Sequence, residues 1–159
     1  MRIRILVASQ SQADFYDVRS LGEAPHLAHR FSDPIAHLHD RDLVSDRPGR
    51  VFDHAPAAVG RRGATAHHGT GGERSPRKHE AEQFAHHIGQ ELARAWRAGE
   101  FERLVVMAGP AFLGLLRKAF PDEVRPSIVA EVTKDLIGHP PHAVQSHLPP
   151  EAFQLIAPA

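Results

Sequence analysis

The sequence predicts a single α/β domain built on a mixed five-stranded sheet with flanking helices. Three observations support this fold class. Short runs rich in strand-forming residues open the chain, a long helical pattern follows a polar middle segment, and strands and helices then alternate. The chain has 159 residues, 42% of them apolar and 24% charged, which suits one domain with one core.

Three strands are predicted before the middle segment. Ile3–Ala8 is apolar and β-branched, and residues 13–20 are rich in strand formers. The polar residues 9–12 between these runs indicate a hairpin. Residues 25–31 form the third candidate strand. Its expected inner face consists of Leu27, His29 and Phe31.

Residues 32–75 differ from the rest of the chain, because Asp, Arg, His, Gly and Pro prevail there. Ser32-Asp33-Pro34 could cap a short helix, but no periodicity is sustained beyond it. A loop of this length inside a small domain is usually functional or disordered. We therefore expect the function of the protein to depend on this segment.

A helix is predicted to open at Ser75 and Pro76, since serine is a favoured N-cap and proline suits the first helical turn. Gly99 is its expected C-cap. The apolar positions recur at helical spacing and define a buried face. They are Ala81, Phe84, Ala85, Ile88, Leu92, Ala95 and Trp96.

The second half of the chain alternates between strands and helices. A buried strand is expected at 104–108, then a helix that Gly109-Pro110 starts, and a strand at 126–132. The expected inward residues of this helix are Phe112, Leu113, Leu115 and Leu116.

Three further features are predicted beyond the last strand. Thr133 could cap a short helix that Gly138 ends, and Pro140-Pro141 starts a final turn or two up to about Leu148. Residues 149–159 are expected to form a tail that is ordered only if it docks, so the domain proper spans residues 1–148. A meander followed by βαβ crossovers implies a mixed sheet, on the general plan of ribonuclease H-like folds and related folds of the translation machinery.

Composition excludes several classes of protein. There is no cysteine, so disulfides and thiolate metal sites are absent. Nineteen basic residues balance nineteen acidic ones, so any electrostatic partner must meet a local patch. The apolar run at the N-terminus is shorter than the ~7–15 residues of a secretory signal. Glycine and proline break the apolar stretch 104–116, which falls short of the ~18 residues of a membrane span. We expect a cytoplasmic protein.

The sequence also lacks the patterns of common catalytic sites. A two-metal nuclease needs carboxylates on adjacent strands, and neither Ile3–Ala8 nor residues 104–108 carry one. There is no serine nucleophile elbow, phosphate-binding Walker A loop or dinucleotide fingerprint. The thirteen histidines show no strong metal-ligand spacing, and the adjacent His86 and His87 would point about 100° apart on a helix. No cofactor or metal is predicted, and a binding protein is favoured over an enzyme.

Two parts of the middle segment are candidates for binding. In residues 40–53, charges of alternating sign surround small apolar anchors. They indicate either a loop held down by ion pairs or an arginine patch for phosphates or carboxylates. The patch would consist of Arg41, Arg47 and Arg50.

The second candidate covers residues 67–78, where glycines form a tip whose backbone can approach a partner closely. Residues 41–78 contain seven arginines and one lysine against three aspartates and one glutamate, an excess of four positive charges. This is a modest anion-binding footprint, and the alternative is a solvated linker. The candidate contacts are Gly71, Gly72, Glu73, Arg74, Arg77 and Lys78.

Four segments, in order along the chain, resemble the bacterial host-attachment family, described as proteins required for attachment to host cells. They are residues 42–50 (DLVSDRPGR), 78–85 (KHEAEQFA), 110–117 (PAFLGLLR) and 129–136 (VAEVTKDL). The resemblance extends from the first strand to about Leu148. The family name describes a phenotype and specifies no reaction.

The family is in turn similar to the middle domain of archaeal and eukaryotic peptide-chain release factors. In that domain a Gly-Gly-Gln tip precedes a long helix and enters the peptidyl-transferase centre. Gly71-Gly72-Glu73 stands at the corresponding place here, before the helix that starts at Pro76. Glu73 replaces the neutral amide with a carboxylate that RNA phosphates would repel. The resemblance thus implies ribosome docking more than peptidyl-tRNA hydrolysis.

The combined interpretation is a non-enzymatic cytoplasmic protein that contacts an anionic partner, RNA or the ribosome, through its middle segment. Attachment to a host would then be an indirect effect. Two alternatives remain open. One is a release-factor-like peptidyl-tRNA hydrolase that acts through Gly71-Gly72-Glu73. The other is an adhesion factor at the cell surface.

Overall fold

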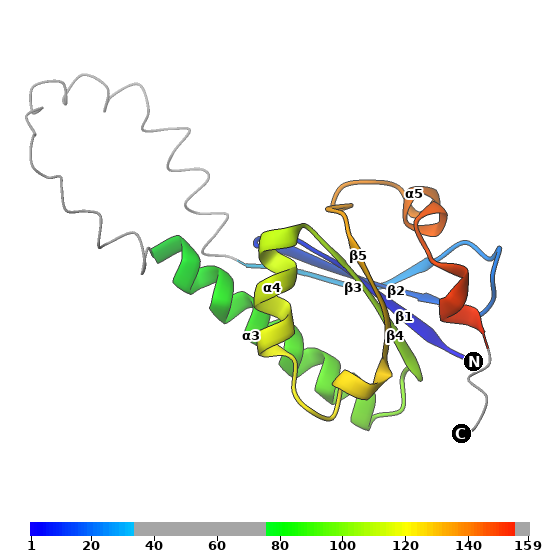
Figure 1. Cartoon of the computed structure of the whole chain (residues 1–159), viewed down its shortest axis with the longest axis horizontal. Coiled ribbons are helices and arrows are strands. Elements are labelled where there is room, and N and C mark those ends of the chain that lie inside the picture. Colours follow the sequence, from blue (N-terminus) through cyan, green and yellow to red (C-terminus); the bar gives the residue numbers. More distant parts are fainter. Residues whose placement is uncertain (34–75, 155–159) are drawn as a thin grey trace, which may run out of the picture.

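The fold is known from a computed structural model that describes residues 1–33 and 76–154 (Figure 1). Its sheet has the strand order β3-β2-β1-β4-β5. Strands β1, β2 and β3 pair antiparallel, whereas β1, β4 and β5 are parallel. The predicted mixed five-stranded sheet and element order are therefore confirmed. The strands are β1 (Ile3–Ala8), β2 (Gln12–Val18), β3 (His26–Ser32), β4 (Arg103–Ala108) and β5 (Ile128–Thr133).

Helices lie on both faces of the sheet. Helices α3 and α4 pack on one face, and α5 with the 3-10 helix η3 packs on the other (Figure 1). None of the helices described is long and apolar enough to cross a membrane. The helical elements are α3 (Pro76–Arg97), α4 (Pro110–Ala119), η2 (Arg125–Ser127), α5 (Pro141–Ser146) and η3 (Pro150–Phe153).

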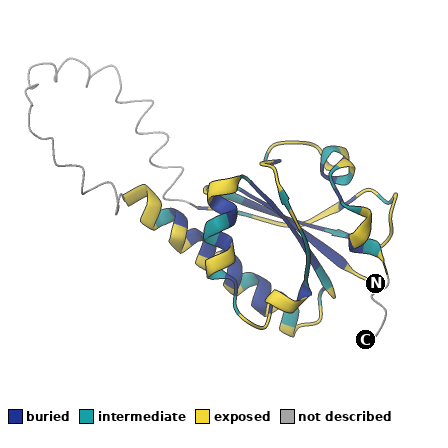
Figure 2. Cartoon of the chain, in the orientation of Figure 1, coloured by how far each residue is buried: buried dark blue, intermediate teal, exposed yellow. Residues whose placement is uncertain are grey.

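The alternation of strand side chains divides the core into two clusters. Leu6, Phe15 and Val106 point towards α3 and α4, whereas their neighbours Ile5 and Val105 point towards α5 and η3. All six residues of β1 are buried, and so are the last five of β4, because these central strands are covered on both sides (Figure 2). Their predominantly apolar sequences, interrupted in β1 by Arg4, are consistent with this double burial.

Helix α3 begins at Pro76, as predicted, and buries the expected apolar face except for the partly exposed Trp96. The helix ends at Arg97, and Gly99 follows with a φ of +72°, a left-handed conformation that glycine adopts at low cost. The N–H of Glu100 then donates to the carbonyl of Ala95 at 2.9 Å, which satisfies a terminal acceptor of the helix.

Helices α3 and α4 approach each other closely at Gly89. A Cβ atom at this position would lie 2.8 Å from the carbonyl oxygen of Ala119 and 3.2 Å from Cδ of Pro121. Only glycine therefore allows this contact between the backbones. The packing brings Phe84 of α3 to 6.2 Å from Phe112 of α4, measured between ring centroids.

The prediction that Leu27, His29 and Phe31 share one face of β3 was wrong for Leu27. A register shift between Phe15 and Tyr16 leaves Ala28 without a partner, so His29 lies opposite Phe15 and Leu27 lies opposite Tyr16. Phe15 and Tyr16 point to opposite faces of the sheet. The bulge thus separates Leu27 from His29 and Phe31, a change that simple alternation does not reveal.

Three expectations for the second half of the chain also need correction. The short helix expected between Thr133 and Gly138 is absent: Thr133 is the last residue of β5, and the Asp135 side chain accepts the N–H of Ile137 in a turn instead. Strand β5 begins only at Ile128, after the 3-10 helix η2. Leu115 of α4 is half-buried rather than fully inward.

Three remaining expectations concern the C-terminal tail and the two borders of the middle segment. Residues 150–153 form η3, and Ala152 is buried against the sheet. The short helix expected after Asp33 and the N-cap expected at Ser75 lie outside the residues that the structure describes.

Candidate functional site

Several chain segments meet at the edge of the sheet where the parallel strands β1, β4 and β5 end, here called the carboxyl edge. Strand β3 runs parallel to β1 and also ends there, since Ser32 pairs with Gln12 at the start of β2. Helix α3 begins at the same edge, because it runs back along the sheet to the start of β4 (Figure 1). In open α/β sheets, ligands bind outside the carboxyl ends of the strands.

Two of the predicted site residues lie at this edge. Arg77 and Lys78 belong to the first turn of α3 and are exposed to solvent. The first buried residue of α3 is Ala81, so the opening turn of the helix extends past the core. The other predicted contacts lie outside the described residues. They are Arg41, Arg47, Arg50, Gly71, Gly72, Glu73 and Arg74.

A groove between α3 and α4 begins at Lys78. It has a volume of about 320 Å³, and we call it the α3–α4 groove. One wall is formed by residues that recur every four positions on α3 and therefore share one side of the helix. The other wall comes from the second half of α4. The lining residues are Lys78, Glu82 and His86 of α3, and Leu115, Lys118 and Ala119 of α4.

Cations outnumber carboxylates around this groove. Among the described residues that line the groove, Lys78 and Lys118 are the cations and Glu82 is the carboxylate, and Arg77 stands beside them on the first turn of α3. Within the described part of the chain, neither Arg77 nor Lys118 has a carboxylate within ion-pair distance. Leu115 and Ala119 add apolar surface. The groove can therefore hold an anionic group against an apolar wall.

Sequence reasoning missed Lys118 and His86 as members of this site. The sequence marks His86 only as a possible metal ligand beside His87, and it marks residues 110–119 only for their inward apolar face. No local pattern links Lys118 to Lys78, because the two residues belong to different helices. The only indication in the sequence that His86 belongs with Lys78 was the four-residue spacing of Lys78, Glu82 and His86 along the predicted helix.

The opposite edge of the sheet, here called the amino edge, carries a different arrangement of charges. Arg4 is buried, with 7% of its side chain exposed, and binds Asp17 through Nε at 2.8 Å and Nη2 at 2.9 Å. Its Nη1 donates to Glu100 at 3.2 Å, and its guanidinium lies 5.5 Å from the ring centre of Phe101. Arg94 donates to the other oxygen of Glu100 at 3.0 Å.

These contacts shift the pKa values of Arg4 and Glu100 in the direction that favours charge. Hydrogen bonds from Arg94 and then Arg4 lower the pKa of Glu100 below its ordinary value, although burial opposes the shift. Burial acts against the charged form of Arg4, but Asp17 and Glu100 raise its pKa overall. The amino-edge network is therefore ionised and closed within itself, which is typical of a structural role.

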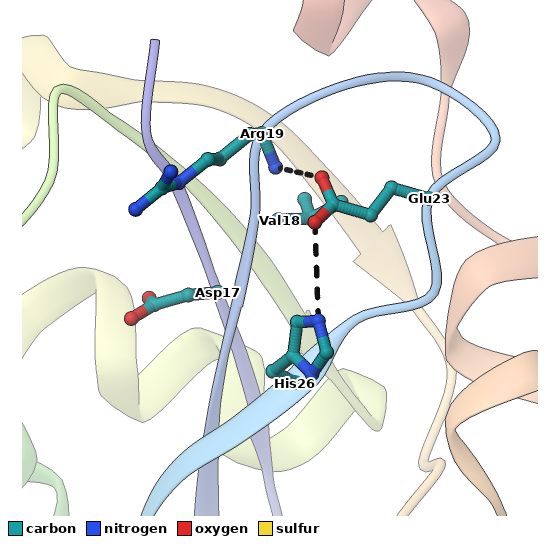
Figure 3. A pocket seen from close by; sticks show the side chains of 5 residues that line it. All are labelled: Asp17, Val18, Arg19, Glu23 and His26. Atoms are coloured by element: carbon teal, nitrogen blue, oxygen red, sulfur yellow. Dashed lines mark hydrogen bonds and ion pairs between the residues drawn. The ribbon is translucent and has the colours of Figure 1, made fainter.

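A second hollow, of about 330 Å³, lies at the turn between β2 and β3 (Figure 3). Its Glu23 accepts the backbone N–H of Arg19 at 2.9 Å and that of Ser20 at 3.2 Å, and its other oxygen is 3.8 Å from Nε2 of His26. The hydrogen bond from Arg19 is the main cause that lowers the pKa of Glu23. Glu23 therefore holds the turn together, and its bonding capacity is largely used there.

The described residues contain no group of three or more His, Asp or Glu side chains that could hold a metal ion. This statement covers residues 1–33 and 76–154 only. The α3–α4 groove and the adjoining turn of α3 bring cations from two helices together beside apolar surface, and we take this surface as the candidate site.

Comparison with known proteins places the sequence within a family. A search of curated proteins finds no match. A family model described as "Protein required for attachment to host cells" matches residues 4–148, which is most of the chain and includes both walls of the groove. The chain therefore belongs to the host-attachment family.

Proposed function

We propose that this host-attachment protein is a non-enzymatic binding protein that contacts RNA through cations around the first half of α3. The observation that carries the proposal is the α3–α4 groove. Its lysines come from two helices, and Lys118 and the neighbouring Arg77 have no carboxylate partner among the described residues. Basic side chains on one face, next to apolar surface, are the electrostatic footprint of nucleic-acid binding.

The remaining predicted contacts would extend this surface. Arg74 and Gly72 adjoin α3 in the sequence, and residues 41–78 carry an excess of positive charge. Since the overall charge of the chain is zero, binding would depend on this local patch. In this proposal the protein acts in the cytoplasm, the ribosome is the first RNA-containing partner to test, and the effect on host attachment is indirect.

Sedimentation of a cell lysate through a density gradient tests the proposal. We expect the protein to travel with ribosomal particles at low salt and to leave them as salt rises, because phosphate contacts release counterions. The double variant Arg77→Gln/Lys118→Gln should dissociate at lower salt than the wild type. Arg19→Gln is the matched control, since Arg19 is exposed at the β2–β3 turn, far from the groove.

Two results would contradict the proposal. The protein could remain at the top of the gradient under every salt condition, which would remove the ribosome as its partner. Alternatively, Arg19→Gln could weaken sedimentation as much as the double variant does. Equal effects of this kind would mean that binding depends on the overall charge of the protein and not on the groove.

A further inference from the structure

A row of aromatic rings reaches the surface on strand β3. The ring of Phe31 stacks on Phe15 at 5.5 Å between centroids, and His29 lies 5.6 Å from Phe31 and 6.0 Å from Phe15. On its other side Phe31 meets Phe84 of α3 edge-on at 5.6 Å. The row therefore starts at an exposed histidine and ends in the core beneath α3.

The exposure of this row follows from the position of β3 in the sheet. Phe31 and His29 pair with Ala13 and Phe15, so both rings lie on the face that α3 covers. However, β3 is the edge strand, and all its residues except the half-buried Phe31 are exposed. His29 thus presents its ring to solvent while its neighbours hold the ring in place.

A cation of the proposed binding surface lies on the same side of α3. Arg77 precedes Phe84 by seven residues, which is about two helical turns and about 10 Å along the axis. Residues at this spacing share one side of a helix. Because Phe84 points towards the sheet, where it contacts both Phe31 and Phe112, Arg77 projects from the same side of α3 nearer to the carboxyl edge.

The carboxylates of β2 that flank these rings are already neutralised. Asp17 is held by Arg4, and Asp14, which points to the opposite face, accepts Nε of Arg30 at 2.7 Å and Nη2 at 3.1 Å. An incoming phosphate would therefore meet the charge of Arg77 without facing a bare carboxylate on this strand. His29 precedes Phe31 towards the amino edge, whereas Arg77 lies beyond Phe84 towards the carboxyl edge. The ring and the cation therefore suit a strand of several nucleotides, whose bases have flat π-faces and whose phosphates are anionic.

We propose that His29, supported by Phe31, stacks on an unpaired base of single-stranded RNA whose backbone contacts Arg77. The inference rests on the proposed function for its phosphate contacts. It adds a preference for single-stranded over double-stranded RNA, which the groove alone does not explain. The bases of a duplex are stacked on each other and present no free face. Stacking on a ring also accepts every base, so little sequence selectivity is expected.

Fluorescence anisotropy with the full chain tests this inference. The probe is a labelled uridine homopolymer of about a dozen nucleotides, which is within the site size of one single-strand-binding domain. The comparison is an unlabelled duplex of the same length as competitor. We expect the single strand to bind more tightly than the duplex, and His29→Ala to weaken its binding by about fivefold or more. His29→Phe should bind within about twofold of the wild type, because phenylalanine keeps the stacking surface.

His142→Ala is the matched control, since His142 is an exposed histidine on α5, on the opposite face of the sheet. Equal affinity of His29→Ala and wild type, or equal binding of duplex and single strand, would overturn the stacking inference. If Arg77→Gln/Lys118→Gln still weakened binding in that case, the proposed function would stand alone. If the wild type bound neither RNA, both proposals would fall together.

Discussion

The two edges of the sheet use their cations in different ways. At the amino edge, Arg4 and Arg94 share Glu100, and Arg4 also binds Asp17, so every charge in the network has a partner. At the carboxyl edge and in the adjoining groove, Arg77 and Lys118 have no such partner within residues 1–33 and 76–154. The amino edge thus holds a closed structural network, whereas the carboxyl edge and its groove present cations that a ligand can reach.

The largest expected effect concerns the amino edge. Arg4→Ala should lower the free energy of unfolding by about 2–4 kcal/mol, because it leaves Asp17 and Glu100 without their buried partner. The partners are about one-third exposed, which limits the loss. Urea unfolding measures this change. Arg77→Ala should alter the same quantity by less than about 0.5 kcal/mol, and equal losses for the two variants would erase the distinction between the edges.

The packing that forms the groove is expected to tolerate less change than its exposed surface. Gly89→Ala should cost about 1–3 kcal/mol, since the new methyl group would lie 2.8 Å from the carbonyl oxygen of Ala119. Gly114→Ala on α4 is the matched control, because a Cβ atom added there would have nothing within 4 Å and alanine favours a helix. Thermal unfolding should rank Gly89→Ala below wild type and Gly114→Ala at or above it. The reverse order would contradict the close approach of α3 and α4.

Salt dependence sharpens the comparison at the carboxyl edge. For binding to single-stranded RNA, the slope of log K against log salt should become shallower by about 0.7 for each phosphate contact that is lost. Arg77→Gln and Lys118→Gln should each produce such a change in titrations at several salt concentrations. Arg125→Gln should leave the slope unchanged, because Arg125 already pairs with Asp122 at 3.4 Å. A change in affinity with no change in slope would mean that the two cations do not contact phosphate.

The smallest expected effect is a dependence of stability on acid pH. The pKa of Glu100 is lowered in the folded protein, chiefly by Arg94, so its ionised form stabilises the fold. This contribution is fully present above the ordinary glutamate pKa of 4.5 and is lost as pH falls through the lowered folded value. Glu100→Gln should therefore be less stable than wild type at pH 7, and the difference should shrink towards pH 3 in urea unfolding. A difference that does not vary with pH would exclude this linkage.

Several elements of the fold were predictable because their signals are local. Pro76 and Gly99 mark the ends of α3, and the apolar spacing between them defines its buried face. The apolar runs of β1 and β4 indicated central strands. The prediction of a helix directly after Thr133 was wrong for a local reason as well. The side chain of Asp135 offers the backbone N–H of Ile137 an alternative partner.

The candidate site was predictable only in part. Arg77 and Lys78 stood out because they follow a glycine-rich stretch and open a helix. Lys118 and the aromatic pair of His29 and Phe31 did not, because their significance depends on which elements lie beside them. The bulge in β3 was not predictable either, because it depends on how β3 pairs with β2. A one-residue shift reverses the face of every side chain before it, and the sequence of β3 does not mark where the shift occurs.

The sequence by itself determined the element order, the single α/β domain plan and the resemblance to the host-attachment family. These depend on periodicity, helix termini and short motifs, which act over a few neighbouring residues. Only the tertiary structure decided that Lys78 and Lys118 line one groove, that Arg4 closes a network with Asp17 and Glu100, and that His29 remains exposed on an edge strand. The physical reason is that contacts between distant residues follow from how helices and strands pack, and one close approach, such as that at Gly89, sets the position of many side chains at once.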